Sequence, residues 1–446
     1  MGNYLEWSHA WTARIANQGP GAFEARLPGI CKKLKENIAA GELPFLTMPY
    51  RARLENNLPP ILQKIKKFKH MLVLGIGGSA LGARAMQRAF APGQDGPNYH
   101  GPWLWIADNV CAEQFDGLLG KLDPKETVVV TISKSGGTIE TLAQYFLARS
   151  WLMQALGDAW SAQMIVVTDE KNGFLRQEAQ EKALASLEVP DFLGGRYSAL
   201  SAVGLLPAGF LGIDWQGLLA GAAEVAKPIL ENPDNLGSTQ AWELACWAYS
   251  LENHQYGQLI FFCYIPQWAT FGPWFAQLWA ESLGKSGKGS MPVPATGVTD
   301  QHSVNQMFLD GPRDKGCIFV TGQQPETSRK FGMDLPDKWS WLRGKAFGAL
   351  LDAEALGTRM ALCKSGVPLL NMHMGSLDER AAGSMMMLLE QATILTGWLM
   401  GINPVDQPAV ELGKRLANSR LGAPGYVEEA SDLAAFLSAP QDKKTF

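Results

Sequence analysis

The chain has 446 residues, of which 46% are hydrophobic and 18% are charged. This length and composition are typical of a globular α/β protein with two or three domains, and they exclude a disordered or fibrous chain. A formal net charge of −4 gives no basic surface, which argues against nucleic acid or a membrane surface as a partner. Six scattered cysteines without a Cys-x-x-Cys motif predict neither a zinc site nor a disulfide framework, so a reducing cytoplasm fits best.

The N-terminus and the apolar tracts give no sign of export or of membrane insertion. Residues 1–10 lack the basic start and the apolar stretch of a secretory signal. The longest apolar tract, at 384–402, is interrupted by Glu390 and Gln391. We therefore expect a buried helix there instead of a membrane span.

Helical spacing runs from the N-terminus to about residue 68 and is broken by Pro59 and Pro60, which predicts a lead-in of packed helices. Strands then alternate with helices in two series, which predicts parallel sheets covered on both faces. The expected strands are 71–74, 103–107, 127–132, 164–168, 259–264, 317–321, 361–364 and 368–372, and the expected helices are 83–90, 111–119, 138–152, 222–230 and 240–249. The expected domains are a helical lead-in at 1–60, α/β domains at 61–230 and 231–430, and a C-terminal tail at 431–446.

The first chemical signal is the run Ser133-Lys134-Ser135-Gly136-Gly137-Thr138, between an expected strand and the next helix. Hydroxyl groups, free backbone N–H groups and a helix N-terminus together suit a phosphate dianion. The alternative is an ordinary helix cap made by Thr138. The run does not match the Walker A motif, because the glycine spacing and the Lys-Ser/Thr ending are absent.

A glycine-rich turn follows the first expected strand, at Gly75-Ile76-Gly77-Gly78-Ser79-Ala80. It formally matches the dinucleotide fingerprint, but the acidic residue expected about 20 positions later is missing, since Asp108 is the first candidate. Two other interpretations are open. The turn allows close packing of backbones, or it forms a floor for a sugar with Ser79 as a hydroxyl contact.

Two charged residues stand out in apolar surroundings. Arg196 follows two glycines and is suited to stabilise an oxyanion, although a surface pair with Asp191 is the common alternative. Glu281 ends an apolar helix rich in tryptophan, where burial would make a carboxylate a usable base. Its alternative is a surface pair with Lys285, four residues later.

Two polar segments complete the candidates. His302 lies in a polar loop and could exchange a proton with a sugar hydroxyl, whereas His373 between two methionines is expected in the core. Asn403 and Pro404 predict a helix start, after which Gln407 and Lys414 share one helix face. A Glu-Lys surface pair is the alternative for Lys414.

Taken together, these segments resemble the glucose-6-phosphate isomerase family over nearly the whole chain. The matching segments follow the order of the family: 75–82, 133–141, 194–198, 281–285, 301–306 and 406–414. The resemblance implies two flavodoxin-like sugar-isomerase domains with parallel sheets flanked by helices, and a homodimer with active sites shared between subunits. It also implies a small sugar phosphate as substrate, with no metal and no redox cofactor.

By this resemblance, Glu281 is the base that forms the enediol, and His302 assists ring opening from the neighbouring subunit. Lys414 is similar to a lysine near the ring oxygen, Arg196 to the arginine that stabilises the enediolate, and Gln407 to a sugar contact. The remaining substrate contacts are expected at Gly78, Ser79, Ser133, Lys134, Ser135 and Thr138.

The chain departs from the family at two places. Val405 and Pro408-Ala409 replace an aromatic residue and a Trp-Gly pair around Asp406-Gln407, and Gly136-Gly137 replaces Phe-Thr in the phosphate loop. We expect these changes to affect substrate affinity more than chemistry. A sugar-phosphate sensor without activity and an NAD-dependent dehydrogenase are the alternative functions, and mannose 6-phosphate or an amino-sugar phosphate is an alternative substrate.

Overall fold

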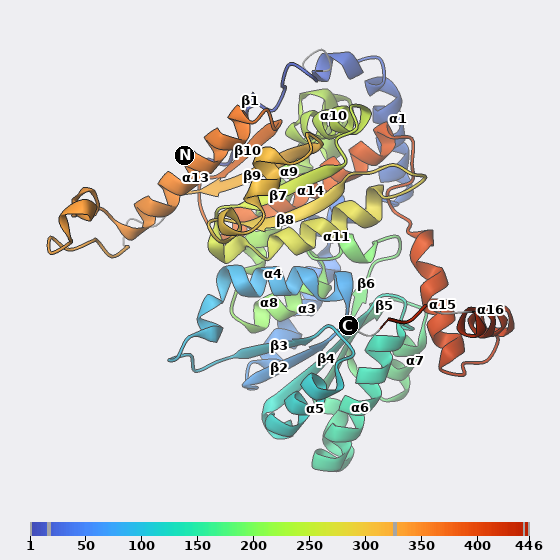
Figure 1. Cartoon of the computed structure of the whole chain (residues 1–446). Coiled ribbons are helices and arrows are strands. Elements are labelled where there is room, and N and C mark those ends of the chain that lie inside the picture. Colours follow the sequence, from blue (N-terminus) through green and yellow to red (C-terminus); the bar gives the residue numbers. More distant parts are fainter. Residues whose placement is uncertain (1, 16–18, 324–327, 440–441, 445–446) are drawn as a thin grey trace. The chain divides into compact units, whose positions relative to one another are not determined.

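The computed structural model describes residues 2–15, 19–323, 328–439 and 442–444 (Figure 1). The chain divides into two compact units, Met1–Pro404 and Val405–Phe446. Both sheets belong to the first unit. The second unit contains only helices among its described residues.

The first sheet consists of five parallel strands in the order β3-β2-β4-β5-β6. This is the flavodoxin-like order that the family resemblance implies. Its central strands are continuous apolar runs, and every residue of β4 is buried, because helices cover both faces. The strands are β2 (His70–Leu74), β3 (Trp103–Ala107), β4 (Thr127–Ser133), β5 (Met164–Asp169) and β6 (Ala185–Val189).

The second sheet has the order β1-β10-β9-β7-β8. Its four later strands are parallel, whereas β1 pairs antiparallel with β10 at one edge. Strand β8 forms the other edge. The strands are β1 (Tyr4–His9), β7 (Gln258–Cys263), β8 (Met291–Thr296), β9 (Lys315–Gly322) and β10 (Leu369–Met374).

Helices surround and connect the two sheets. In Figure 1, α4 lies between the sheets, where it packs against α11. The helices of the first unit are α1 (Leu27–Ala40), α2 (Pro44–Thr47), α3 (Ala52–Ile65), α4 (Leu81–Phe90), α5 (Ala112–Lys121), α6 (Ile139–Leu156), α7 (Phe174–Glu181), α8 (Ala202–Phe210), α9 (Trp215–Glu231), α10 (Gln240–Asn253), α11 (Phe271–Leu283), α12 (Asn305–Asp310), α13 (Phe347–Lys364) and α14 (Glu379–Leu399). The second unit contains α15 (Glu411–Arg420) and α16 (Val427–Ser438).

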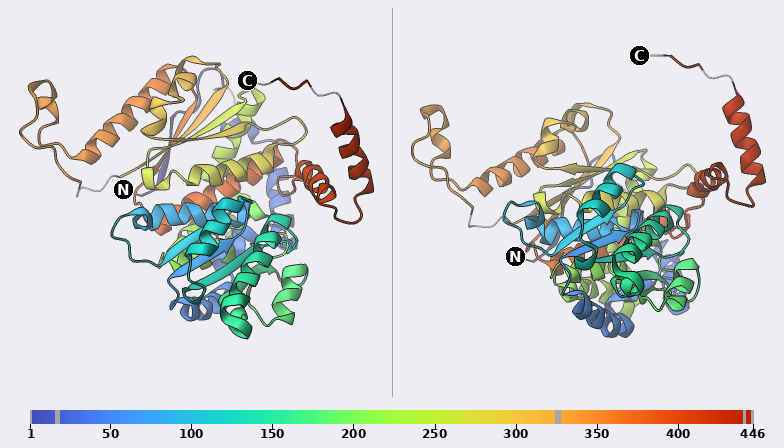
Figure 2. Two further views of the ribbon diagram at one scale, coloured as in Figure 1. Left: turned by 60° about the horizontal axis from the view of Figure 1, so that its bottom comes forward. Right: turned by 90° about the horizontal axis from the view of Figure 1, so that it is seen from below.

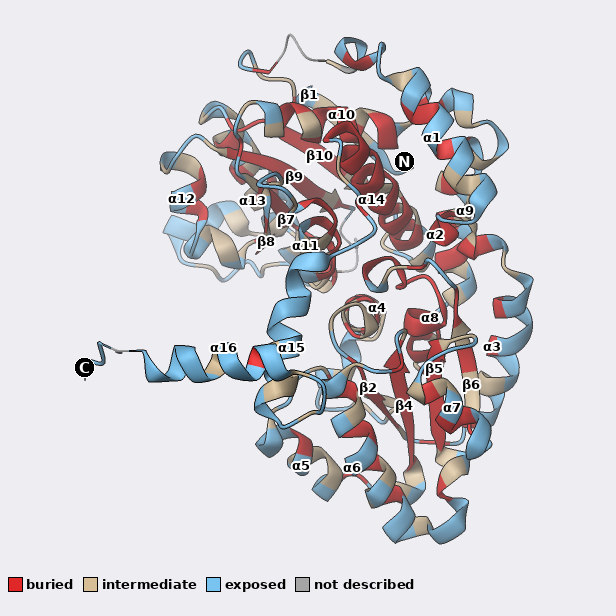
Figure 3. Cartoon of the chain, turned by 90° about the vertical axis from the view of Figure 1, so that its right-hand side faces the viewer, coloured by how far each residue is buried: buried red, intermediate tan, exposed pale blue. Residues whose placement is uncertain are grey.

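The apolar tract near the C-terminus forms α14, which is buried along almost its whole length (Figure 3). It packs against α9, α10 and α11. Among the described helices, none is long and apolar enough to span a bilayer. The prediction of a buried helix at this tract is confirmed.

The lead-in and the C-terminal half differ from expectation at several places. Tyr4–His9 is a strand that pairs antiparallel with the free edge of β10, so no helix forms there. Residues 361–364 end helix α13 and form no strand. Both views of Figure 2 show the short 3₁₀ helix η12 (Asp337–Leu342) and the start of α13 projecting from the second sheet. The domain boundaries at 60, 230 and 430 stay predictions.

Candidate active site

The candidate site forms where the chain order of the first sheet reverses. The chain runs from β2 to β3 on one side and then returns to β4 on the other side of β2. Ligands of open α/β sheets bind at the carboxyl ends of the strands at such a point. The glycine-rich turn follows β2, and the run 133–138, here called the hydroxyl loop, lies at the end of β4. The topology therefore places both motifs at this edge.

Three hydroxyl groups converge at the end of β4 and in the loop that follows it. Ser133 Oγ lies 3.0 Å from Thr138 Oγ1 and 3.5 Å from Ser135 Oγ, and Ser135 Oγ lies 3.4 Å from Thr138 Oγ1. Thr138 is the N-cap residue of α6, yet its side chain makes no capping hydrogen bond. The simple capping interpretation is therefore wrong for its side chain, and the hydroxyl groups face one another at a helix N-terminus.

The same loop carries a lysine and a constrained glycine. Burial lowers the pKa of Lys134, while the carboxylates of Asp169 and Asp191 oppose this shift. Gly136 has a φ of +63°, and a Cβ there would lie 3.2 Å from the backbone nitrogen of Leu175. In this conformation the loop favours glycine at position 136.

The glycine-rich turn after β2 touches two other segments of the site. A Cβ on Gly78 would lie 2.2 Å from the carbonyl oxygen of Gly195, so two loops meet backbone to backbone. A Cβ on Gly77 would lie 2.9 Å from Nε2 of Gln277 on α11. The turn therefore approaches another backbone closely, at the loop after β6. The approach brings Ser79, Arg196 and α11 to one place.

Arg196 is buried, with 1% of its side chain exposed. Its Nε donates to Ser282 Oγ at 2.7 Å, and its Nη2 donates to the carbonyl oxygen of Pro404 at 2.7 Å. Its Nη1 lies 3.3 Å from Oε2 of Glu281. The alternative pair with Asp191 is therefore wrong, because the arginine points inward between α11 and the end of the first unit.

Glu281 lies on α11 with 32% of its side chain exposed. Its Oε1 accepts a hydrogen bond of 2.9 Å from Gln277 Nε2, one helical turn earlier. The alternative surface pair with Lys285 is wrong, since Lys285 Nζ donates to the carbonyl oxygens of Ser282 and Asn403. The carboxylate is thus held on one oxygen by an amide and on the other by a guanidinium, and it remains accessible.

Three residues of this cluster did not emerge from the sequence. Ser282 Oγ lies 2.9 Å from the Tyr197 hydroxyl, and burial raises the pKa of Tyr197 to about 12, opposed by Arg196. Gln277 contacts Glu281. Gln277 and Glu281 are four residues apart on one helix, so the sequence could have indicated this contact. Tyr197 and Ser282, in contrast, are brought together only by tertiary packing.

His302 is exposed in a short 3₁₀ helix, η11 (Thr299–His302), after the edge strand β8. Within the described residues it makes no hydrogen bond or ion pair. Its neighbour Gln301 instead accepts from the Tyr264 hydroxyl and donates to Glu354. The structure therefore does not connect His302 with Glu281.

The second unit carries Gln407 and Lys414. The helix expected at Asn403 and Pro404 does not form there; the 3₁₀ helix η13 (Pro408–Val410) precedes α15, because Pro408 occupies the first position instead. Lys414 Nζ lies 2.8 Å from Glu411 Oε1 on the exposed face of α15. Within the second unit, Lys414 therefore forms the Glu-Lys surface pair that was its alternative interpretation.

Over the residues that the structure covers, no group of three or more His, Cys, Asp or Glu side chains could hold a metal ion. Asp108, which the dinucleotide hypothesis would need, accepts two hydrogen bonds from Arg84. His373, expected in the core, is half-buried and lies 3.1 Å from Thr321 Oγ1.

Parallel α/β sheets, a hydroxyl loop at a helix N-terminus and a carboxylate paired with a buried arginine are the features expected of a sugar-phosphate isomerase of the α/β class. The family model described as phosphoglucose isomerase matches residues 62–329. The chain therefore belongs to the glucose-6-phosphate isomerase family, whose members are aldose–ketose isomerases.

Relatives agree with this placement. The chain is 40% identical to the glucose-6-phosphate isomerase of Rubrobacter xylanophilus over 79% of its length and 82% of the relative. It is 31% identical to that of Carboxydothermus hydrogenoformans over 96% of this chain and 95% of the relative. A Thermus thermophilus structure described as hypothetical protein TT0462 matches with a TM-score of 0.82 and 31% identity, covering 94% of this chain and 99% of that one. Family membership does not favour the sensor or the dehydrogenase.

Proposed function

We propose that the chain interconverts glucose 6-phosphate and fructose 6-phosphate through an enediolate, with Glu281 as the base. The observation that carries this proposal is the pairing of Glu281 with the buried Arg196, beside the glycine-rich turn of the first sheet. A carboxylate can remove a proton next to a carbonyl only when the developing oxyanion is stabilised. The pair supplies both groups.

The phosphate of the substrate is held by the loop after β4. Ser133, Ser135 and Thr138 donate hydroxyl hydrogen bonds, and the N-terminus of α6 adds a positive dipole. Lys134 adds a cation to the same loop. Gly78 and Ser79 contact the sugar, because the absence of a side chain on Gly78 lets the backbone approach it.

In the open-chain aldose, Glu281 removes the proton from C2. The electrons of the C–H bond form a C1–C2 double bond, and the carbonyl oxygen at C1 becomes an oxyanion beside Arg196. Transfer of the hydroxyl proton from O2 to O1 and return of the carbon proton to C1 then give the ketose. Every atom of the sugar is conserved, and no external oxidant takes part.

Ring opening is assigned by the family motif. His302 exchanges the proton of the ring hydroxyl, Lys414 acts at the ring oxygen, and Gln407 contacts the sugar. Since His302 makes no contact with Glu281 in the described chain, we assign it to the site of a neighbouring subunit. The enzyme is then a homodimer with shared active sites. Its location is the cytoplasm, as the cysteine usage indicates.

Exposed apolar side chains support an assembly of two copies. Met333, Trp339, Trp341 and Phe347 are exposed in and around η12 and at the start of α13, the segment that projects from the second sheet. Exposed apolar groups gathered on one segment indicate an interaction surface.

The test is a coupled assay that follows glucose 6-phosphate formed from fructose 6-phosphate. Glu281→Gln removes the base and should lower kcat roughly a hundred- to ten-thousandfold, with sugar-phosphate binding retained. Glu42→Gln, in an exposed loop, is the control and should keep full activity. Added EDTA should change nothing. Near-normal turnover by Glu281→Gln would remove the assignment.

A further inference from the structure

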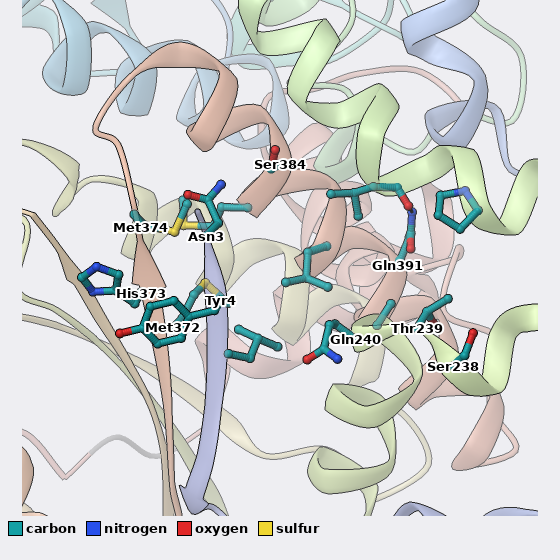
Figure 4. Close-up of a pocket in the computed structure, with 16 residues that line it drawn as sticks. Asn3, Tyr4, Ser238, Thr239, Gln240, Met372, His373, Met374, Ser384 and Gln391 are labelled. Carbon is teal, nitrogen blue, oxygen red and sulfur yellow. Dashed lines mark hydrogen bonds between the residues drawn. The ribbon is translucent and has the colours of Figure 1, made fainter. Parts of the chain in front are cut away.

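A cavity of about 410 Å³ lies in the first unit and shares no lining residue with the candidate active site. Its walls come from β1, the carboxyl end of β10, α9, the start of α10 and α14 (Figure 4). This volume is in the range of small-molecule pockets. A protein segment of several turns would not fit, so the cavity suits a small ligand.

The lining of this cavity carries no formal charge. No Asp, Glu, Lys or Arg is among its 16 lining residues. Burial lowers the pKa of His373, so the imidazole is neutral at neutral pH. An ion would leave water here without a counter-charge, which is costly, so the lining favours an uncharged ligand.

One end of the cavity presents open hydrogen-bonding groups. Gln391 is 2% exposed, and its Nε2 donates to the carbonyl oxygen of Val225 at 3.2 Å. Among the described residues, nothing donates to its Oε1. Gln240 is exposed; its Oε1 accepts from Trp7 Nε1, and its Nε2 is open to water or to a ligand. Figure 4 shows Gln240 and Gln391 at the same end. A ligand N–H at this end would give the buried Gln391 Oε1 the donor that it lacks.

The other end offers a polarisable apolar surface. The rings of Tyr4 and His373 are stacked with centroids 4.8 Å apart. Met372 and Met374 of β10 lie beside them in Figure 4, and Met385 of α14 adds a third thioether to the lining. Thioethers and ring faces pack well against aromatic rings. This end therefore favours a flat ring.

We propose that this cavity binds an uncharged, mainly apolar small molecule with an aromatic ring and an N–H group, which donates to Gln391 Oε1. The ligand is not a sugar phosphate. It would influence the enzyme from a second site, because the cavity lies on α14, and α14 packs against α11, the helix that carries Glu281.

The probe for this site is N-phenyl-1-naphthylamine, an uncharged aromatic amine whose fluorescence rises in apolar surroundings. Titration into the full-length protein should give a saturable rise in fluorescence with one probe bound per chain. Saturating glucose 6-phosphate should not displace the probe. The binding does not depend on turnover, so its failure is separate from a failure of the proposed isomerase activity.

Two variants and a control locate the probe. Leu388→Trp fills the cavity and should abolish the saturable signal, while Gln391→Leu keeps the volume and should weaken binding about fivefold. Leu147→Trp adds the same side chain at an exposed position on α6 and should bind like the wild type. Thermal melts check that each variant is folded.

Equal binding by the wild type and a folded Leu388→Trp variant would overturn the proposal, as would the absence of saturable binding. Sedimentation across protein concentrations tests whether a second copy fills the cavity. Probe binding only by the monomer would assign the cavity to a subunit interface and would also overturn the proposal.

Discussion

Nη1 of Arg196 lies 3.3 Å from Oε2 of Glu281, which joins a buried guanidinium to a carboxylate that is still accessible. The three nitrogens of the arginine reach three different partners. A planar fork with fixed donors suits this arrangement, whereas the ammonium of lysine does not.

We therefore expect Arg196→Lys to lower kcat about a hundredfold, because the oxyanion loses its stabilising donor. The free energy of unfolding should fall by about 1 to 3 kcal/mol, since Ser282 and the Pro404 carbonyl lose a partner. Steady-state kinetics and urea unfolding measure the two effects. Arg53→Lys, at an exposed ion pair with Glu170 and Glu188, is the matched control and should leave both unchanged. Wild-type kcat in Arg196→Lys would contradict the assigned role.

The hydroxyl loop should act on affinity more than on rate. Replacing Ser135 and Thr138 by alanine removes two donors to a charged group, so KM for fructose 6-phosphate should rise at least about tenfold. Inhibition by inorganic phosphate should weaken in parallel. An unchanged KM, or a change in kcat alone, would show that the phosphate binds elsewhere.

The backbone contact between Gly78 and Gly195 gives a steric prediction. Gly78→Ala would place a Cβ 2.2 Å from the Gly195 carbonyl oxygen, so the loop next to Arg196 must move and activity should fall sharply. Gly117→Ala on α5 is the control, because nothing lies within 4 Å of its added Cβ. This second variant should be as active as the wild type and up to about 1 kcal/mol more stable. Full activity of Gly78→Ala would mean that the two loops do not need this contact.

Glu390 gives a prediction on stability against pH. It is fully buried on α14, neither carboxyl oxygen has a hydrogen-bond partner in the described structure, and burial raises its pKa well above the ordinary value. The folded state then holds a proton that the unfolded state releases, so stability falls as the pH rises above the ordinary pKa of a glutamate. Glu390→Gln removes this loss.

The stability advantage of Glu390→Gln should therefore grow from pH 5 to pH 8, by up to about 1.4 kcal/mol per pH unit. Urea unfolding at several pH values measures the difference. Glu42→Gln, in an exposed loop, is the control and should follow the wild type at every pH. A constant difference between Glu390→Gln and the wild type would show that the buried carboxyl group does not titrate in this range.

Shared active sites can be tested by mixing subunits. If His302 serves the site of the partner subunit, a mixed dimer of Glu281→Gln and His302→Ala chains has one site with both defects and one intact site. Refolding the two inactive variants together in equal amounts should recover about a quarter of wild-type activity, because half of the dimers are mixed and each has one working site. Each variant refolded alone is the control. No recovery in mixed dimers, isolated through a different affinity tag on each variant, would place His302 and Glu281 in one chain's site.

The sequence predicted most of the first sheet, because β2, β4 and β5 are apolar runs next to turn residues. It missed β8, whose sequence Met-Pro-Val-Pro-Ala-Thr contains two prolines, and β1, whose partner β10 lies far along the chain. Edge strands depend on what they pair with, so their local patterns are weak.

The motifs of the site were predicted, but their contacts were not. The local alternatives paired Arg196 with Asp191 and Glu281 with Lys285, whereas the structure joins Arg196 to Glu281 across 85 positions. Local spacing predicts only neighbours on one turn or one helix face. A contact between residues this far apart in the sequence depends on how α11 packs against the loop after β6. The Tyr197–Ser282 contact has the same origin.

Strand β8 also prevents the second sheet from adding a further strand at its edge. At both ends of the strand an odd-numbered residue donates toward β7, since the N–H of Met291 bonds to Gly257 and that of Gly297 to Cys263. The donors that would face outward belong to Pro292 and Pro294, which have none, and to Thr296, whose N–H is bound by Asp300. A strand from another molecule would therefore find no free backbone N–H donor along this edge. This edge of the sheet is therefore protected against extension into an aggregate.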